Sequence, residues 1–334
     1  MKTIYNSLVT IDNFLRKNSD KQVEKTILSD LTCSPKKISS MFFYDEKGSK
    51  LFEEITTLPE YYLTRTEIPL IKKAAEYLKD VLKNVNIIEF GSGDPTKISL
   101  ILESIPEKNQ EKITYVPFDV SHAAIQESCN FLLQKYPQIT IHGIVADFMT
   151  QLEVIPKKSN KVLCFLGSTI GNFKRKQAED FLKKLHRIMH QGDRLLLGFD
   201  MVKNKKIIEN AYNDDQKVTE QFNKNILTVV NNLVGTDFNP DDFEHVAFYN
   251  EAFSRIEMHL KATKRIKIYS PLLSTPITIK RGELIHTENS HKFTIGHINK
   301  LAANANFEIE KIFSDEKQWF SLAVLTKPME QNEE

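Results

Sequence analysis

Short apolar runs alternate with helical stretches along the middle of the 334-residue chain, between residues 85 and 200. Few polar residues interrupt the apolar runs, which suits strands that are buried on both faces of a sheet. The stretches between them, such as 96–105 and 122–135, are long enough for helices that connect parallel strands. The pattern predicts a doubly wound, mostly parallel α/β sheet, with strands within residues 85–90, 113–120, 139–148, 161–173 and 193–201.

The rest of the chain does not continue this alternation. Residues 1–80 and 206–233 read as mainly helical, and residues 240–250 read as a further helix. Two runs within residues 254–290 alternate apolar and polar side chains with a period of two, which predicts antiparallel strands. A helix at 294–306 and two strands after it would complete the parallel sheet.

This order predicts two domains. Residues 66–202 and 293–334 would form a cofactor-binding domain around the parallel sheet. Residues 1–65 and 203–292 would form a second, discontinuous α+β domain that binds the substrate.

Composition excludes several classes of partner. The chain has 45 basic and 44 acidic residues and a net charge of +1, so no positive excess indicates a nucleic acid or an anionic lipid. No apolar run approaches the roughly 18 to 20 residues of a membrane helix, and the N-terminal segment lacks the apolar core of a signal peptide. Three widely spaced cysteines do not fit a zinc site or a disulfide framework. We expect a cytoplasmic monomer that binds no nucleic acid and no membrane.

A glycine-rich turn follows the first predicted strand in the stretch "NIIEFGSGDPTKISLILE". Gly91 and Gly93 let the backbone approach a ligand closely, but Thr96 stands where a dinucleotide fingerprint needs a third glycine. Asp119, at the end of the second strand, is placed to accept hydrogen bonds from a ribose, and Asp147 follows the third strand. The sequence thus offers acidic residues for an adenosine but lacks the third glycine that would pack against a pyrophosphate. This combination favours S-adenosylmethionine over NAD. A NAD-dependent or nucleotide-sugar enzyme on the same fold remains an alternative.

Longer motifs resemble one family, the histidine-specific Nα-methyltransferases that make trimethylhistidine (hercynine) for ergothioneine biosynthesis. The resemblance runs in order from about Ser34 to Lys327. It implies a Rossmann-like class I methyltransferase fold, the cofactor S-adenosylmethionine and a small amino-acid substrate. The motifs are "FFYDEKGSKLFEEITTLPEYYLTRTE", "FLGSTIGNF", "AYNDD", "FNKNIL", "FEHVAFYN", "RIEMHL" and "HTENSHKF".

The resemblance also assigns roles at the α-amino and α-carboxyl end of the substrate. Asn172 and Tyr212 would bind the carboxylate, with Tyr44 nearby. Tyr61 would lie near the α-amine, and Phe52 would line the same pocket. Tyr61, Asn172 and Tyr212 are therefore the expected catalytic residues. From the residues alone, Asn172 could equally be a turn residue and Tyr61 a packing aromatic.

The imidazole would be read by Glu288 and Ser290, with Thr219 and Met258 as further pocket residues, all by resemblance. Without the family, Glu288 reads as a solvated charge at a strand end. Cofactor contacts are expected from Glu89, Gly91, Ser92, Gly93, Lys97, Asp119, Asp147 and Phe148.

The chain also departs from the family pattern. Asp94 and Pro95 alter the charge and stiffness of the glycine loop, next to the expected methionine end of the cofactor. His286 and His291 flank Glu288, but alternating faces of a strand explain this spacing better than a metal site, and we expect no metal.

Three alternatives to histidine methylation stay open. The substrate could be another amino acid, such as a tryptophan derivative that fungal relatives methylate. The chain could be the oxidoreductase named above, or a binding module that has lost its chemistry.

Overall fold

The computed structural model describes residues 2–6, 8–15, 19–157 and 160–328. The chain divides into two compact units. Unit 1 consists of the described residues of Met1–Leu15, Leu63–Val202 and Phe293–Glu334, and unit 2 of those of Arg16–Tyr62 and Lys203–Lys292. Along the described ranges, no helix is long and apolar enough to cross a membrane.

Unit 1 is built on a nine-stranded sheet in the order β1-β2-β6-β5-β4-β7-β8-β15-β14. Strands β2, β6, β5, β4, β7 and β8 run parallel, while β15 is antiparallel to both of its neighbours. The expected doubly wound sheet and its closing strand pair are thus confirmed. The strands are β1 (Lys2–Asn6), β2 (Val9–Asn13), β4 (Asn86–Phe90), β5 (Thr114–Asp119), β6 (Thr140–Val145), β7 (Lys161–Phe165), β8 (Arg194–Asp200), β14 (Glu308–Ser314) and β15 (Phe320–Thr326).

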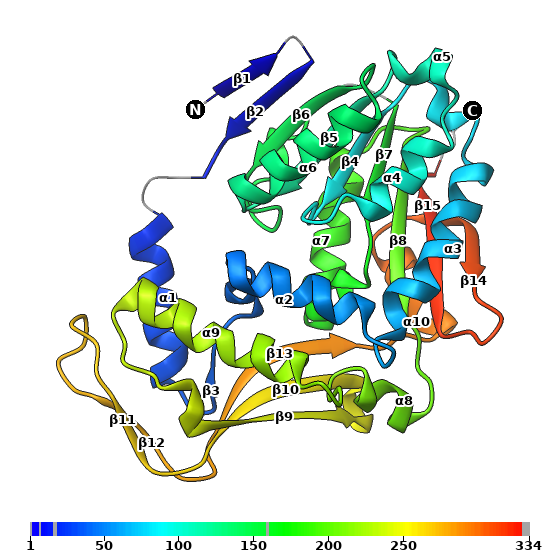
Figure 1. Ribbon diagram of the computed structural model, residues 1–334. Coiled ribbons are helices and arrows are strands. Elements are labelled where there is room, and N and C mark those ends of the chain that lie inside the picture. Colours follow the sequence, from blue (N-terminus) through cyan, green and yellow to red (C-terminus); the bar gives the residue numbers. More distant parts are fainter. Residues whose placement is uncertain (1, 7, 16–18, 158–159, 329–334) are drawn as a thin grey trace, which may run out of the picture. The chain divides into compact units, whose positions relative to one another are not determined.

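Helices cover both faces of this sheet (Figure 1). Apolar residues of α3, α4 and α6 pack on one face, and those of α7 and α10 pack on the other. Burial on both faces explains why the central strands carry almost no polar alternation. The helices of unit 1 are α3 (Tyr62–Tyr77, whose first residue belongs to unit 2), α4 (Thr96–Glu103), α5 (Glu107–Gln110), α6 (His122–Lys135), α7 (Arg175–Ile188) and α10 (Ile295–Asn304), with short 3₁₀ turns η2 (Val81–Lys83), η3 (Leu152–Val154) and η4 (Thr169–Asn172).

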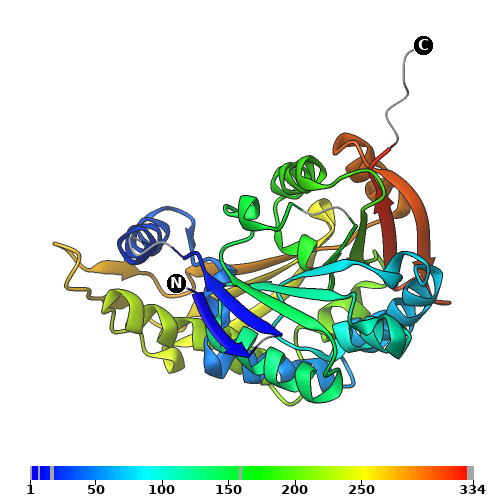
Figure 2. The same cartoon turned by 90° about the horizontal axis from the view of Figure 1, so that it is seen from above.

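The N-terminus corrects two expectations. Strands β1 and β2 pair as an antiparallel hairpin where a helix was expected, and β2 pairs in parallel with β6 at the edge of the sheet (Figures 1 and 2). The expected assignment of residues 1–65 to the second domain is therefore wrong for residues 2–6, 8–15 and 63–65, which belong to unit 1. The part of the prediction that falls on residues 1, 7 and 16–18 lies outside the described residues.

Unit 2 contains a four-stranded sheet in the order β3-β13-β10-β9, with α9 packed against β9 and β10 and α2 packed against α9. The antiparallel pairs β9–β10 and β10–β13 confirm the strands expected within 254–290. The elements are α1 (Ser19–Thr32), β3 (Lys36–Lys37), η1 (Ser40–Phe43), α2 (Glu46–Thr57), α8 (Lys205–Asn210), α9 (Val218–Val234), η5 (Pro240–Asp242), β9 (Phe243–Asn250), η6 (Glu251–Phe253), β10 (Arg255–Ala262), β11 (Ile266–Ile268), β12 (Ile277–Ile279) and β13 (Leu284–His291).

The helix expected at residues 240–250 is wrong. Only Pro240–Asp242 turn as a 3₁₀ helix, and the rest is strand β9, paired with β10 along its whole length. Pairing with a neighbouring strand satisfies the backbone groups of this segment, so tertiary context overrides a helix-like start. The helical stretch expected at 206–233 is divided into α8 and α9 by the segment 211–217.

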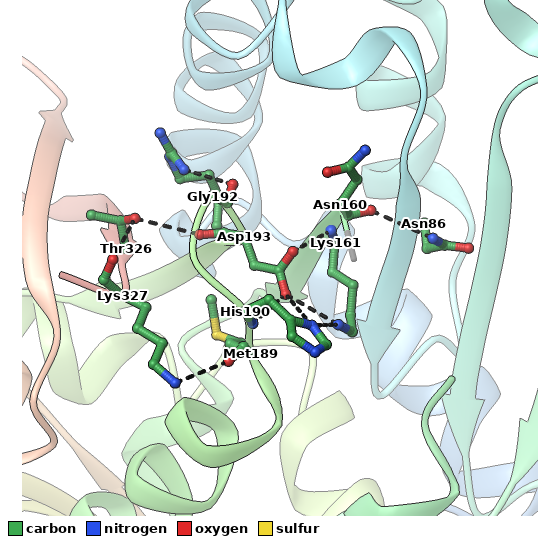
Figure 3. A network of polar contacts seen from close by, with 10 residues as sticks. Asn86, Asn160, Lys161, Met189, His190, Gly192, Asp193, Thr326 and Lys327 are labelled. Carbon is green, nitrogen blue, oxygen red and sulfur yellow. Dashed lines mark hydrogen bonds and ion pairs between the residues drawn. The ribbon is translucent and has the colours of Figure 1, made fainter. Parts of the chain in front are cut away.

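A buried ion pair stabilises the amino ends of β7 and β8 (Figure 3). Lys161 and Asp193 are 1% and 0% exposed, and Lys161 Nζ lies 3.1 Å from Asp193 Oδ2. The backbone N–H of Lys161 donates to Oδ1 of Asp193 at 2.7 Å, and the backbone N–H of His190 donates to Oδ2 at 2.8 Å. The carboxylate therefore ties the starts of two neighbouring strands together.

We expect Asp193→Asn to lower the free energy of unfolding by about 3–5 kcal/mol, because it leaves the Lys161 ammonium buried without its counter-charge. Urea unfolding followed by circular dichroism measures this loss. Glu46→Gln, which breaks the exposed Glu46–Lys50 pair on α2, is the matched control and should leave the midpoint unchanged. Equal midpoints for the two variants would contradict the role given to Asp193.

Candidate functional site

The glycine loop lies at the carboxyl end of β4, where the chain order of the sheet reverses between β5 and β7. Such a switch point is the usual ligand site of a doubly wound sheet. Gly91 has φ of +73° and donates its N–H to the carbonyl of Phe118 at 2.9 Å. A Cβ added at Gly91 or Gly93 would meet no atom within 4 Å, so open space borders both residues. Ser92 is fully buried, and its Oγ has no hydrogen-bond partner among the described residues.

Asp94 and Pro95, which differ from the family pattern, stand directly before helix α4. Asp94 Oδ1 accepts hydrogen bonds from the N–H and the hydroxyl of Thr96, at 2.9 and 2.7 Å. Helix α4 begins at Thr96, directly after Pro95. This local turn gives the two unusual residues a structural role and explains why a threonine stands at position 96.

Glu89 lies on β4 just before the loop and is 4% exposed. The Tyr115 hydroxyl donates to its Oε2 at 2.5 Å. Burial raises the pKa of Glu89 to about 8, although the Tyr115 hydrogen bond and Lys97 oppose the shift. The carboxyl therefore holds its proton at neutral pH in this structure. Its predicted contact with a cofactor stays a prediction.

Asp119 and Asp147 lie at the same edge of the sheet, because β4, β5 and β6 are neighbouring parallel strands. Asp119 Oδ1 accepts the N–H of Ser121 at 2.8 Å, and burial raises the pKa of its carboxyl. Asp147 accepts the N–H of Met149 and the hydroxyl of Thr150, both at 2.8 Å, and so closes a turn. Of the two carboxylates, Asp119 fits a ribose contact better, since both oxygens of Asp147 already serve this turn.

Phe148 is half-buried and packs edge-on against other phenylalanines at this end of the sheet. Its ring centroid lies 5.9 Å from that of Phe90 and 5.7 Å from that of Phe165. These ring contacts anchor Phe148 in the core, and its predicted contact with a cofactor stays a prediction.

Glu67 on α3 was not predicted as a site residue, yet it connects two loops at this edge. It is 0% exposed; its Oε1 accepts the N–H of Gly167 at 2.7 Å, and its Oε2 lies 2.7 Å from Lys97 Nζ. Gly198 leaves room for the carboxylate, since a Cβ there would come within 2.7 Å of Oε1. The predicted cofactor residue Lys97 is thus fixed by an ion pair. The signal in the sequence is a carboxylate within the apolar i, i+4 stripe of α3, between Leu63 and Ile71.

Asn172 ends the 3₁₀ turn η4 that follows β7. Gly167 and Ser168 both have positive φ, +71° and +56°, and Ser168 Oγ accepts the N–H of Asp200 at 2.8 Å. These contacts hold the loop against β8. Because β7 runs parallel to β4, the half-buried Asn172 follows the same edge of the sheet as the glycine loop.

Unit 2 brings together Tyr61 and Phe52, which were assigned to the amine end of the substrate, and Tyr44, which was assigned near its carboxylate. The ring of Phe52 lies 5.7 Å from that of Tyr44 and 6.3 Å from that of Tyr61. Phe222 of α9, which the sequence did not predict, lies 5.9 Å from both Tyr44 and Phe52. Its signal in the sequence is the motif "FNKNIL", which begins with this phenylalanine.

A second cluster in unit 2 joins Tyr212, Ser290 and Lys292. The Tyr212 hydroxyl donates to Ser290 Oγ at 2.8 Å. Lys292 Nζ donates to the same Oγ at 2.9 Å and to the Tyr212 hydroxyl at 3.1 Å. Two residues expected at opposite ends of the substrate are thus one hydrogen bond apart, and both contact a lysine that the sequence did not predict.

Glu288 and Met258 stand opposite each other on the paired strands β13 and β10. Glu288 is 8% exposed; burial raises the pKa of its carboxyl to about 7, and the nearby Lys292 ammonium opposes this shift. The interpretation of Glu288 as a solvated strand-end charge is therefore wrong. Thr219 is also buried, at the start of α9, where its N–H donates to Asp214 Oδ1 at 2.8 Å. Within the described ranges, no group of three or more metal-ligating side chains is arranged to hold a metal ion.

Comparisons with known proteins agree with this geometry. The family model described as "Histidine-specific methyltransferase, SAM-dependent" matches residues 23–327. A histidine N-alpha-methyltransferase from Mycobacterium tuberculosis (strain CDC 1551 / Oshkosh) is 34% identical over 305 residues, which cover 91% of this chain and 95% of that protein. One from Mycolicibacterium smegmatis is 32% identical and covers 96% and 99%. Ergothioneine biosynthesis protein 1 from Schizosaccharomyces pombe is 29% identical and covers 87% of this chain and 39% of that protein.

We expect Gly91→Ala to lower the free energy of unfolding by about 1–2 kcal/mol, because an L side chain is strained at the left-handed φ of this residue. Gly93 has the same open surroundings without a left-handed φ, so Gly93→Ala should leave stability unchanged. Denaturant unfolding without ligand measures both values. If Gly93→Ala costs as much as Gly91→Ala, backbone strain is not the cause.

The pKa of Glu89 predicts a pH-dependent stability. Between the unfolded value of about 4.3 and the folded value of about 8, the folded chain binds one proton more than the unfolded chain, so stability falls as pH rises. Glu89→Gln lacks this proton equilibrium. Its free energy of unfolding should therefore rise relative to the wild type by up to about 1.4 kcal/mol per pH unit between pH 5 and 8.

Unfolding curves at several pH values measure this difference. Glu127→Gln, on an exposed position of α6, serves as the control. A difference between Glu89→Gln and the wild type that stays constant with pH would show that Glu89 is ionised in the folded protein.

Proposed function

Because the chain belongs to the family of histidine-specific, S-adenosylmethionine-dependent methyltransferases, we propose that it methylates the α-amine of L-histidine. Three transfers would give the trimethylated betaine hercynine, the first step of ergothioneine biosynthesis. The match to a protein named for ergothioneine biosynthesis supports this pathway. We also propose a cytoplasmic monomer that acts on this small molecule.

The observation that carries the choice of substrate is the buried polar cluster of unit 2. Glu288, Ser290 and Lys292 are 8%, 4% and 0% exposed, so an apolar side chain bound beside them would leave charged and hydroxyl groups without partners. A site lined by hydrogen-bonding groups binds a ligand without matching donors and acceptors much more weakly, because its buried polar groups are then left without partners. An imidazole has two ring nitrogens to offer, whereas an indole has a single N–H.

The two units would divide the binding. We propose that unit 1 binds S-adenosylmethionine, which supplies a methyl group on a positively charged sulfur. The residues present fit this cofactor, because open space beside Gly91 and Gly93, a buried Ser92 hydroxyl and the Asp119 carboxyl group lie at one sheet edge. Glu89, Lys97, Asp147 and Phe148 remain proposed contacts, with Lys97 and Phe148 held by Glu67 and by the phenylalanine core.

Unit 2 would bind the amino acid. The rings of Tyr44, Phe52 and Tyr61 suit a cationic amine and its methylated forms, since each cation–π contact contributes about 0.5–2 kcal/mol without a fixed hydrogen-bond direction. The amine must lose a proton before it can attack, and Tyr61 is our proposed acceptor through a water molecule. The resemblance alone assigns the carboxylate to Asn172 of unit 1 and to Tyr212. Because the Tyr212 hydroxyl donates its single hydrogen to Ser290 Oγ, we propose Asn172 as the carboxylate donor and Tyr212 as a support of the Ser290 hydroxyl. Thr219 and Met258 would line the pocket.

We expect purified protein, incubated with L-histidine and S-adenosylmethionine, to form species that carry one, two and three added methyl groups. Mass spectrometry of the products measures this, with a tryptophan derivative and L-phenylalanine as competing substrates. Preference for the tryptophan derivative would overturn the choice of histidine. Binding of histidine without any methylation would overturn the enzymatic function.

In the same assay, Glu288→Ala should lower kcat/KM for histidine by roughly 10- to 100-fold, because a buried charge-assisted hydrogen bond is lost. Affinity for S-adenosylhomocysteine should not change, since its proposed residues belong to unit 1. Glu244→Ala, an exposed glutamate of the same sheet, is the matched control.

A further inference from the structure

Lys292 directly follows strand β13 and is 0% exposed. Its backbone N–H donates to the carbonyl of Ser254 at 2.7 Å, which fixes the start of its side chain. Its ammonium donates to Ser290 Oγ at 2.9 Å and to the Tyr212 hydroxyl at 3.1 Å, and it lies 4.9 Å from the centroid of the Tyr212 ring.

We propose that Lys292 is a positioning residue that forces the Ser290 hydroxyl to donate its hydrogen to the substrate, and so makes the site specific for a ring with an unprotonated nitrogen. The inference rests on the proposed function and extends it to a residue with no assigned role.

The direction of the hydrogen bonds carries this inference. An ammonium has only donors, and a hydroxyl oxygen has two lone pairs. Ser290 Oγ accepts one hydrogen bond from Tyr212 and a second from Lys292, so both lone pairs are used. The hydrogen of Ser290 must therefore go to a third atom, and that atom must be an acceptor.

The cost of burying Lys292 shows how strongly the site depends on it. Removing an ammonium from water is expensive unless hydrogen bonds and opposite charge compensate. Two hydroxyls and the field of Glu288, the carboxyl group proposed to face the other side of the ring, contribute to this compensation. An apolar residue at position 292 would avoid this cost, but it would leave Ser290 able to turn either way.

A neutral imidazole matches the resulting pattern. It presents one N–H donor and one nitrogen acceptor, and the two faces of the pocket present an acceptor at Glu288 and an obligatory donor at Ser290. A pyrrole ring keeps the N–H but has a C–H in place of the acceptor nitrogen. An imidazolium has two donors, one of which would meet the Ser290 hydrogen. Lys292 would therefore select both the ring and its neutral form.

The test compares histidine with 3-(pyrrol-2-yl)alanine and 3-(pyrrol-3-yl)alanine, each of which lacks the acceptor nitrogen. We expect Lys292→Met to lower kcat/KM for histidine by about 10- to 100-fold. The values for the two pyrroles should change by less than about threefold, since they never used the Ser290 hydrogen. The ratio of kcat/KM for histidine to kcat/KM for the pyrroles would thus decrease. Unchanged S-adenosylhomocysteine affinity and an unchanged unfolding midpoint would show that the variant is folded.

Ser290→Ala gives a second route to the same result, should Lys292→Met fold poorly. It should narrow the preference to the same extent, and the double variant should lose little more than either single variant, because both act through one hydrogen bond. Lys261→Met, an exposed lysine on β10, is the control and should keep the wild-type preference.

Two outcomes would overturn the inference. One is an equal loss for histidine and the pyrroles in Lys292→Met, which would indicate a purely structural lysine. The other is additive losses in the double variant. Wild-type protein that methylates none of the three compounds would instead overturn the proposed function, whereas the two outcomes above, with a wild type active on histidine, overturn only the role of Lys292.

Discussion

The pairing of β4 with β5 on one side and β7 on the other is the constraint on which unit 1 depends. Parallel strands end at the same edge, so this arrangement brings the glycine loop, Asp119 and the loop before Asn172 together although they are far apart in sequence. The segments after β4 and β7 lead to helices on opposite faces of the sheet, α4 and α7. Glu67 connects the two segments through Lys97 and Gly167.

Buried charges recur in this protein, and their partners indicate what each one does. Lys161 and Asp193 satisfy each other and two backbone N–H groups, which suits a structural pair far from the glycine loop along β7. Glu67 also has a charged partner, but its contacts hold loops. Lys292 differs, because the partners of its ammonium include two neutral hydroxyls that the resemblance places against the substrate. A charge that is compensated by orientable hydroxyls fixes their direction, which a closed ion pair does not.

The sequence predicted the parallel sheet well because burial on both faces removes polar alternation from a strand. The hairpin β1–β2 was missed for the opposite reason: "KTIYN" and "VTIDN" are short and partly polar, and only the pairing of β2 with β6 makes them strands. Strand β9 was missed because Pro240 and two aspartates imitate the first turn of a helix. The partner of β2 is distant in sequence, whereas β9 pairs with the next strand, β10; in both cases the pairing partner lies outside the segment, so the periodicity within the segment does not show it.

In the site, too, local sequence patterns miss contacts between distant residues, but one pattern along a strand does indicate a buried polar face. Tyr212 and Ser290 are separated by 78 positions, and no spacing rule joins them, so their roles came from the resemblance to a family. Glu288, Ser290 and Lys292, however, stand at alternate positions along one strand and its end, and side chains two apart in a strand share a face. Met258 and Ile256 pair with Glu288 and Ser290 and are themselves buried. A carboxylate, a hydroxyl and an ammonium on one buried strand face are costly to the fold, and this cost is explained if a polar ligand completes the hydrogen bonds.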